Sequence, residues 1–446
     1  VGGGAILPEP ENCIYIGDEG HRLGDTAIRH FGAECRINST LSWLERIPKQ
    51  CKGQTTLFAK DKTLAEQLPK IESEAENLYD LLAMAYPVMK DYIDRSEEFD
   101  SSFRFSHGDV GKTIRDIATQ IVKHTSTWLG RLEVLEDTLS DALSDKQYPV
   151  AIADIEVFYQ QAGSWLSGAE RLLMLWDRLR KETKIGEAPI ACWLKLDDLA
   201  DGNMDISINA SPIQAAEILE NRLWGSCYAA VLTSATLRSL GNFNALQRET
   251  GIPSSSLFLS VAGAFDYAKA ASLKVPSDAA EGNSVEQHTE YIINNLLSLI
   301  ESNVGTLVLF SSKKQMEQVF DNLPKDLTKF VLIQGQYSNR EMIRLHKERI
   351  DQGNTSVLLG LASFAEGVDL PGDYCRHVII AKLPFAVPND PLQQALAEWI
   401  EVNGGNSFFD ISLPLASLRL IQAAGRLLRT ETDEGTVTIL DKRLVS

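Results

Sequence analysis

The chain has 446 residues, of which 44% are hydrophobic and 23% charged, and its formal net charge is −18. This is the composition of a folded globular protein too long for one core, so we expect two to four domains. The acidic balance argues against a surface that binds DNA nonspecifically everywhere, although one positive groove is sufficient for a nucleic-acid function.

The absence of a long apolar run and the spacing of the cysteines narrow the class of protein further. No apolar run reaches the roughly twenty residues of a bilayer span, so we expect a soluble, intracellular protein with no membrane partner. Six cysteines are scattered without a C-x-x-C pair, which argues against a disulfide framework or a zinc site. The chain begins with Val1 and runs directly toward a strand, so we expect a piece of a longer protein.

In chain order, the first segment is predicted to be a strand with a polar turn, and the second a helical insertion. Residues 1–37 hold the short strand Cys13–Ile16. Across residues 38–187 apolar side chains recur at three- and four-residue steps, as in Leu129–Leu139, which predicts a bundle of antiparallel helices. A polar break interrupts this pattern at Ser96–Asp109.

The third segment, residues 188–260, returns to strands. Ala191–Leu196 and Met204–Ile208 flank the turn signal Asp201–Asn203, and the apolar strand Ala229–Leu232 follows.

In the fourth segment, residues 261–446, strands alternate with helices. The strands read as short, fully apolar runs, which favours a parallel sheet covered on both faces. These runs are Gly305–Phe310, Phe330–Ile333, Val357–Gly360, Val378–Ile380 and Val437–Leu440.

Two carboxylates follow the first strand, in the sequence Asp18-Glu19-Gly20-His21. A carboxylate at the carboxyl end of a strand can hold Mg²⁺ through water, and a second one beside it can orient the water that attacks a nucleoside triphosphate. Taken alone, the same four residues also describe a solvated turn.

Two other strands end in motifs of the same kind. Thr233–Thr236 places hydroxyls around a small residue, which could link a nucleotide site to a second domain or cap a helix. Ser363–Gly372 combines two acids with two glycines, which suits a loop beside a nucleotide or a phosphate backbone as well as a generic loop.

The most specific segment is Gln422–Arg429. Arg426 and Arg429 are three residues apart and are predicted to lie on one helical face, while Gly425 permits close backbone approach. Paired cations near a core need anionic partners, and a transferred phosphate would serve. The alternative for this segment alone is a helix with two solvated arginines.

The order of these four motifs is that of motifs II, III, V and VI of superfamily 2 helicases. The chain resembles the iron–sulfur helicases of the XPD group over nearly its whole length, and most closely their bacterial DinG type. Val231–Leu240 and Leu440–Leu444 extend the match. The resemblance implies an α/β fold with tandem RecA-like domains of the P-loop NTPase class and an all-helical Arch domain inserted into the first.

Under this resemblance, residues 1–37 and 188–260 form the first, incomplete RecA-like domain, residues 38–187 the Arch domain and residues 261–446 the second RecA-like domain. It also implies an ATP-dependent 5′→3′ DNA helicase of the bacterial cytoplasm and nucleoid, monomeric, with ATP and Mg²⁺ as cofactors. A [4Fe–4S] cluster would be held by four cysteines upstream of this chain. The expected partners are single-stranded and forked DNA, D-loops, R-loops or DNA–RNA hybrids, and a single-stranded-DNA-binding protein.

The resemblance also implies roles for individual residues in the catalytic site. Asp18 would bind Mg²⁺ through water, Glu19 would position the hydrolytic water, and His21 completes the same motif. The residues expected to complete the γ-phosphate site from the second domain are Gln422, Gly425, Arg426 and Arg429.

Further implied roles concern coupling and DNA. Ser234 and Thr236 would couple the ATP site to DNA, and Glu366 and Asp369 would contact the nucleotide-facing and DNA-facing sides of the cleft. The residues expected to contact the DNA backbone are Ser311, Ser312, Gln334 and Ser363. Candidates for stacking on bases, with core packing as the alternative, are Trp165, Trp176, Phe364 and Phe385.

Two departures from the family remain. The first motif has Gly20 where an alanine is usual, which we expect to cost only local rigidity. The phosphate loop G-x-x-x-x-G-K-[ST] should precede Asp18 and is not in this chain. Gly108–Thr113 imitates it, but Ser106 stands where a glycine is needed and the polar break replaces the buried strand. The alternatives are therefore a noncatalytic binding module and a phosphotransferase using Gly108–Thr113.

Overall fold

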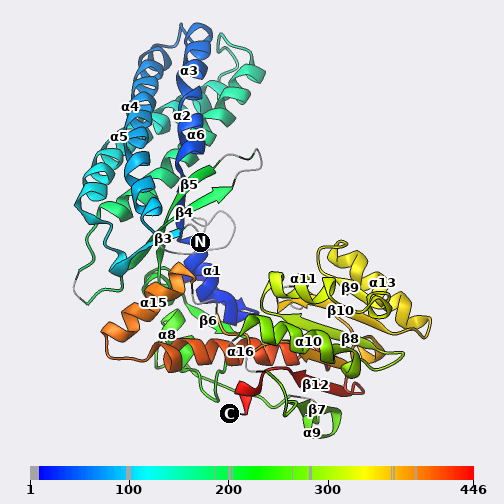
Figure 1. Ribbon diagram of the computed structural model, residues 1–446. Coiled ribbons are helices and arrows are strands. Elements are labelled where there is room, and N and C mark those ends of the chain that lie inside the picture. The colour runs from blue at the N-terminus through cyan, green and yellow to red at the C-terminus, as the bar shows by residue number, and fades with distance from the viewer. Residues whose placement is uncertain are drawn as a thin grey trace.

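The computed structural model describes residues 10–96, 102–184, 186–198, 202, 204–263, 265–280, 284–362, 364, 367–386 and 389–445. A helical part stands at one end of the molecule and a parallel sheet at the other (Figure 1). Within the described ranges, no helix has both the length and the apolar character needed to cross a bilayer.

The helical part confirms the predicted helical insertion. Its helices are α2 (Ile37–Leu44), α3 (Arg46–Leu57), α4 (Lys62–Asp94), α5 (Gly111–Ser144) and α6 (Ile152–Arg180). Most of the apolar residues at helical spacing are buried between them, and Leu64 and Leu132 are fully so, whereas Leu129 is half-buried. Asp61 caps α4 by accepting the Leu64 N–H at 3.0 Å. The sequence periodicity thus produces one continuous core.

A four-stranded antiparallel sheet closes the base of these helices. Its strands, in spatial order, are β2 (Ala33–Arg36), β5 (Met204–Pro212), β4 (Ile190–Asp198) and β3 (Ser102–Phe105). Cys35, Leu194 and Ile208 of the sheet belong to the same hydrophobic cluster as the helices. We call α2–α6 with this sheet the helical module. Its β4–β5 hairpin lies in residues 188–260, the range assigned from the sequence to the first RecA-like domain.

The predicted polar break at Ser96–Asp109 is wrong in part, because β3 occupies its second half. Phe103 and Phe105 pack their rings on each other and on Tyr92, with centroids 5.1 to 5.2 Å apart. Aromatic side chains at alternate positions favour a strand, and here this preference outweighs the tendency of the surrounding serines and acids to form a loop.

The segment between the two ends of the molecule contains a parallel pair of strands, β1 (Ile14–Gly17) and β6 (Ala229–Leu232). A two-stranded sheet is marginal by itself. After β1 the chain continues into α1 (Leu23–His30). This helix packs with α7 (Ala216–Leu219) and lies beside α8 (Asn244–Thr250).

The second half of the chain forms a six-stranded, fully parallel sheet, as the apolar runs predicted. Its spatial order is β7-β12-β11-β8-β10-β9. The strands are β7 (Ala271–Lys274), β8 (Gly305–Phe310), β9 (Val331–Ile333), β10 (Ser356–Leu361), β11 (His377–Ile380) and β12 (Gly435–Ile439). Neighbouring residues of β8 enter different clusters, Leu307 and Leu309 on one face and Val308 and Phe310 on the other, so both faces are covered.

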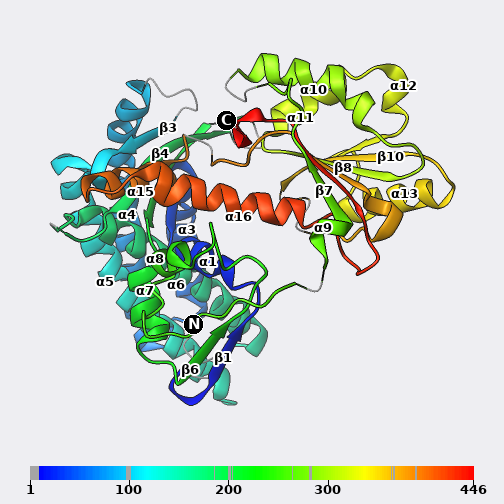
Figure 2. The same cartoon turned by 90° about the horizontal axis from the view of Figure 1, so that it is seen from below.

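The helices of this half are α9 (Tyr267–Ala270), α10 (Val285–Leu299), α11 (Lys313–Asp321), α12 (Lys325–Thr328), α13 (Asn339–Asp351), α15 (Pro391–Val402) and α16 (Leu413–Ala424). α15 leaves the sheet and packs on β4. α16 returns from α15 toward the sheet (Figure 2). This excursion brings the end of α16 to the motifs that follow β1 and β6.

Candidate nucleotide site

The first and second motifs meet because β1 and β6 are parallel neighbours. Their register pairs Gly17 with Leu232, so Asp18 and Thr233 are the next residues on adjacent strands. The Thr233 hydroxyl donates to Oδ1 of Asp18 at 3.0 Å, and the Gly20 N–H donates to the Thr233 carbonyl at 2.9 Å. Thr233 was named within its motif but was given no role of its own, although it follows β6 as Asp18 follows β1.

Glu19 and His21 extend this contact into the loop. Glu19 has a left-handed backbone with φ of 52°, which costs a non-glycine residue about 1–3 kcal/mol. The Ser234 hydroxyl donates to Oε2 of Glu19 at 3.3 Å, and Nδ1 of His21 lies 2.7 Å from Oγ of Ser234. Oγ of Ser234 also accepts the Thr236 N–H at 3.1 Å. The two motifs therefore share one polar network.

Gln422 joins this network from the end of α16. Its amide nitrogen donates to Oγ1 of Thr236 at 3.0 Å and to Nε2 of His21 at 3.0 Å. Since Nε2 accepts, the proton of the imidazole lies on Nδ1, which donates to Ser234. A continuous chain of hydrogen bonds thus runs from α16 to the carboxylate of Glu19. We call the six-stranded sheet with its helices the second α/β part, and β1 and β6 with α1, α7 and α8 the first.

Gly20 has a packing role that the sequence did not reveal. A Cβ atom at this position would lie 2.9 Å from Cβ of Leu232 in β6. The expectation that glycine costs only local rigidity was therefore wrong. The close approach of the loop to β6 requires a residue without a side chain.

The two arginines of the last motif do not lie on a helix, which corrects the prediction. α16 ends at Ala424, and Gly425 follows as its cap. The Arg426 and Leu427 N–H groups donate to carbonyls three residues back, at 3.3 and 3.1 Å. Leu427 and the adjacent Leu428 follow and are both buried, 1% and 7% exposed. The chain instead turns tightly toward β12.

Asp433 organises this turn and was also missed. It is 6% exposed and accepts the N–H groups of Arg429, Thr430 and Gly372 at 2.7, 2.9 and 3.1 Å. These hydrogen bonds and that from the Thr430 hydroxyl at 2.6 Å hold the pKa of Asp433 below its usual value, although burial opposes them. A sequence reader could have found it in the cap-like spacing Thr430-x-x-Asp433.

The structure also pairs Arg429 with the loop after β10. Nε of Arg429 lies 3.3 Å from Oδ1 of Asp369, and its Nη2 donates to the Val368 carbonyl at 2.9 Å. The third and fourth motifs are thus in contact. Two predicted residues of that loop, Ser363 and Glu366, lie outside the described residues.

The remaining predicted DNA contacts follow strands of the six-stranded sheet. Ser311 and Ser312 follow β8, and Ser312 caps α11 by accepting the Gln315 N–H at 3.3 Å. Gln334 follows β9, and its Oε1 accepts the Leu361 N–H at 2.8 Å. β10 lies between β8 and β9 in the sheet, and the carboxyl ends of these parallel strands form one edge.

Three of the four candidate stacking residues belong to the core. Trp165, Trp176 and Phe364 are 2%, 0% and 1% exposed, so their helical or loop spacing reflected packing. Phe385 differs, because its ring lies 5.9 Å from that of Phe408 near the surface.

The segment Gly108–Thr113, which imitates a phosphate loop, binds a carboxylate of the protein itself. β3 does precede it, contrary to the prediction, but in an antiparallel sheet. The carboxylate of Asp109 accepts the Gly111 N–H at 2.9 Å and pairs with Arg115 at 2.7 Å. An internal carboxylate thus takes the place of an anion at the start of α5, which disfavours the phosphotransferase alternative.

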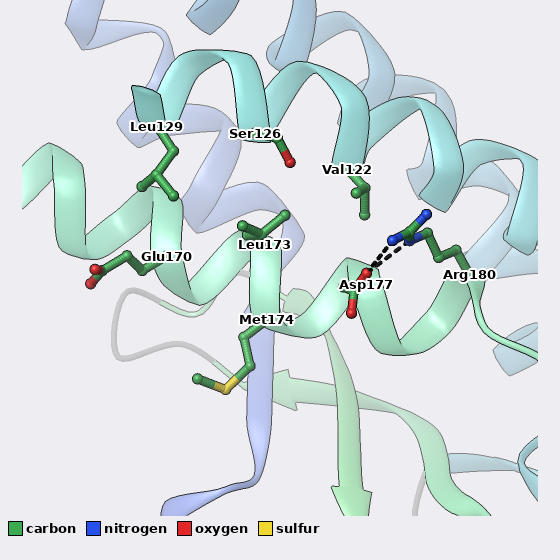
Figure 3. A pocket seen from close by; sticks show the side chains of 8 residues that line it. All are labelled: Val122, Ser126, Leu129, Glu170, Leu173, Met174, Asp177 and Arg180. Carbon is green, nitrogen blue, oxygen red and sulfur yellow. Dashed lines mark hydrogen bonds and ion pairs between the residues drawn. The ribbon is translucent and has the colours of Figure 1, made fainter. Parts of the chain in front are cut away.

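A cavity of 690 Å³ lies in the helical module, between α5 and α6 (Figure 3). All its lining residues come from these two helices, and its Asp177 is already paired with Arg180 at 2.6 Å. The motif residues converge elsewhere, at the end of α16.

The donor set at Asp18 fits a magnesium ion bound with ATP. Mg²⁺ usually takes one or two carboxylates and fills its other positions with water and phosphate oxygens. Asp18 is exposed and has a hydroxyl, that of Thr233, beside it. Over the described ranges, no three His, Cys, Asp or Glu side chains are arranged to hold a metal by themselves.

The cysteines of this chain do not fit an iron–sulfur cluster. All six are free thiols, four of them buried and two half-buried. Burial raises the pKa of Cys35, Cys51, Cys192 and Cys375 to about 12, whereas cluster ligands are thiolates.

Comparison with known proteins agrees with the motif order. Residues 293–446 match the family described as the helicase C-terminal domain. The whole chain is 34% identical to the ATP-dependent DNA helicase DinG of Photobacterium profundum and covers 64% of it. It is also 31% identical to DinG of Escherichia coli, over 99% of this chain and 62% of that protein. Over its whole length the chain is similar in sequence to these DinG helicases.

The likeness to DinG confirms the family resemblance that the motifs indicated, and this chain spans about 64% of the length of that relative. Solved structures show the fold. Xpd4 of S. tokodaii superposes with a TM-score of 0.55 at 14% identity, over 98% of this chain and 73% of that one. An XPD helicase gives 0.50 at 14% identity, over 98% and 66%. The predicted fold class, RecA-like α/β with a helical insertion, is confirmed.

Proposed function

We propose that this chain is the motor part of an ATP-dependent DNA helicase that moves 5′→3′ on single-stranded DNA. The observation that carries the proposal is the bridge made by His21, which contacts Ser234 and Glu19 on one side and Gln422 on the other. Such a bridge makes the geometry of Glu19 depend on how the two α/β parts are docked. The names of the DinG relatives support the same activity.

In this proposal Asp18 holds Mg²⁺ through water and Glu19 orients the attacking water. Gln422, Arg426 and Arg429 close on the γ-phosphate from the second α/β part, with Gly425 allowing the turn, and Asp369 positions Arg429. Bound ATP would supply the phosphoryl group and the negative charge that these side chains recognise. Ser234 and Thr236 transmit domain closure to the DNA.

The finer assignments belong to the same proposal. The Arch domain would be residues 38–187 and the second RecA-like domain residues 261–446, with Ser311, Ser312, Gln334 and Ser363 on the DNA backbone and Glu366 facing the nucleotide. The native-length protein would act as a monomer in the bacterial cytoplasm, on forks, D-loops or R-loops in repair and replication. It would carry a [4Fe–4S] cluster on upstream cysteines and meet a single-stranded-DNA-binding protein.

The test is ATP hydrolysis by the native-length protein, with and without single-stranded DNA, beside a Glu19→Gln variant. We expect stimulation by DNA that the variant loses, because the amide cannot orient the water in the same way. A rate indifferent to DNA, or unaffected by Glu19→Gln, would remove the proposal.

A second candidate is a noncatalytic nucleic-acid or protein binding module. The Gly-Lys-Thr sequence of this chain favours it, because Asp109 already accepts the Gly111 N–H there. This loop therefore has no free site for a phosphate, and a module without one would bind without turnover. Turnover of ATP by this chain alone would contradict the second candidate.

A further inference from the structure

Three phenylalanines pack on one another near the surface of the second α/β part. Phe385 follows β11, while Phe408 and Phe409 begin the π-helical segment Phe408–Ser412, which leads directly into α16. The ring centroids of Phe385 and Phe408 are 5.9 Å apart with planes inclined by 30°, and those of Phe408 and Phe409 are 5.3 Å apart. Phe408 is 47% and Phe409 64% exposed. Clustered exposed rings mark a binding surface more than a folding need.

The two exposed rings are held by a fixed backbone. Oδ1 of Asn406 accepts the N–H groups of Phe408 and Phe409 at 3.0 and 3.1 Å. Asp410 accepts the Asn406 N–H at 2.8 Å and pairs with Arg248 of α8 at 3.1 Å. A ligand that stacks on these rings would therefore lose little affinity to ordering of the backbone.

Positive charge surrounds the inner ring. Cζ of Arg443 lies 5.7 Å from the centroid of Phe385, and Nη1 of Arg419 donates to the Pro384 carbonyl at 3.4 Å. Arg443 is paired with the buried carboxylate of Asp441 at 2.6 Å. Arg419 therefore adds cationic charge next to Phe385, and Lys382 lies three residues before Phe385 in the chain. Cations near aromatic rings suit bases joined by phosphates.

The position of this cluster in the sheet connects it with the predicted DNA contacts. Lys382 follows β11, and Ser311 follows β8, the parallel neighbour of β11. The carboxyl ends of adjacent parallel strands lie on one edge, roughly 4.8 Å apart. Single-stranded DNA that reaches Ser311 along this edge would meet the phenylalanines next to it, beyond the end of β11.

We infer that Phe408 and Phe409, backed by Phe385, form a stacking step for bases of single-stranded DNA, with Lys382 and Arg419 on its phosphates. This inference rests on the proposed DNA function and names a contact within it. Stacking on an aromatic face is indifferent to base identity, so the step would grip any sequence.

The experiment measures equilibrium binding of the native-length protein, without nucleotide, by fluorescence anisotropy. The probes are a labelled oligothymidine and an abasic oligonucleotide of the same length, which keeps the phosphates and lacks the bases. We expect the double variant Phe408→Ala/Phe409→Ala to bind oligothymidine about tenfold more weakly and the abasic strand unchanged. Unchanged oligothymidine affinity, or equal weakening on both probes, would overturn the inference.

Two further variants complete the design. Phe330→Ala is the matched control, since Phe330 is 39% exposed and precedes β9 at the opposite edge of the sheet, and it should affect neither probe. Arg419→Gln should weaken both probes alike and lower the salt slope by about one. If the unaltered protein binds neither probe, the proposed DNA function fails as well. If it prefers oligothymidine and the double variant keeps that preference, the stacking step alone fails.

Discussion

Nε2 of His21 accepts a hydrogen bond of 3.0 Å from the amide of Gln422, although 401 residues separate the two in the chain. One side chain follows β1 and the other ends α16, so the contact exists only when the two α/β parts are docked. The same amide group holds Thr236 at 3.0 Å. Docking is thereby linked to the side chains around Glu19.

Replacing Gln422 tests this link. In Gln422→Ala, His21 and Thr236 lose their shared donor, and we expect DNA-stimulated ATP turnover of the native-length protein to fall between about tenfold and a hundredfold. The melting temperature should change little, because the side chain is at a polar surface. Ile421→Ala is the control, since Ile421 is 49% exposed on the preceding position. A rate equal to that of the control would contradict a role for the bridge.

Gly20→Ala should destabilise the protein by about 1–3 kcal/mol, because the new methyl group would press on Cβ of Leu232. Urea unfolding, followed by fluorescence, measures the change. Because Cβ remains in every substitution except glycine, Leu232→Gly is the partner that removes the clashing atom. The double variant Gly20→Ala/Leu232→Gly should then be less destabilised than the sum of the two single changes. Simple additivity would show that the two positions do not clash.

His346 predicts a loss of stability in acid. It is fully buried between the Ser356 hydroxyl, which donates to Nδ1 at 2.9 Å, and the Tyr374 carbonyl, which accepts from Nε2 at 2.8 Å. Burial lowers its pKa to about 4, against 6.5 for an ordinary histidine. The unfolded chain therefore binds a proton first as pH falls, and stability present above pH 6.5 declines by about 3 kcal/mol between pH 6.5 and 4.

The measurement is the urea midpoint as a function of pH for the protein and for His346→Gln. The variant should be less stable at pH 8 but should lose less stability between pH 6.5 and 4. His288 and His377 also have pKa values lowered by burial and keep part of the slope. Parallel pH profiles for the two proteins would exclude His346 as a source.

The helical module is joined to α15 by an ion pair that predicts energetic coupling. Nη1 of Arg104 lies 2.9 Å from Oε2 of Glu398, and the same carboxylate accepts the His107 N–H at 2.7 Å. Both side chains are largely buried, 15% and 21% exposed. Arg104→Ala or Glu398→Ala alone should each cost about 2–4 kcal/mol, because the partner charge is left without its counter-ion.

A double-mutant cycle by chemical denaturation, with hydrogen exchange in α15 as the local readout, measures this coupling. The change in Arg104→Ala/Glu398→Ala should be smaller than the sum of the single changes, and exchange in α15 should rise in each single variant. Lys269→Ala/Asp266→Ala is a matched control, an exposed ion pair of 3.0 Å whose coupling should be within about 1 kcal/mol. Equal coupling in both cycles would contradict the prediction.

The sequence by itself determined the local structure and the family resemblance. The helical periodicity of residues 38–187 predicts the helices, and the apolar runs predict the strands of the six-stranded sheet. Both predictions succeed because residues close together in the chain determine whether a segment forms a helix or a strand. The motif order identified the DinG resemblance without any contact being known. Asp18 and Ser234 were selected because each belongs to a motif that follows a predicted strand.

Tertiary structure alone decided which of these residues meet. Gln422 reaches His21 because α16 returns from an excursion onto the helical module, and Gly20 is required because the loop passes close to Leu232. Neither fact leaves a periodic signal in the sequence, since both depend on packing between segments hundreds of residues apart. The same reason explains the error at the last motif: the end of α16 before Arg426 is set by neighbours in space, which spacing along the chain does not record.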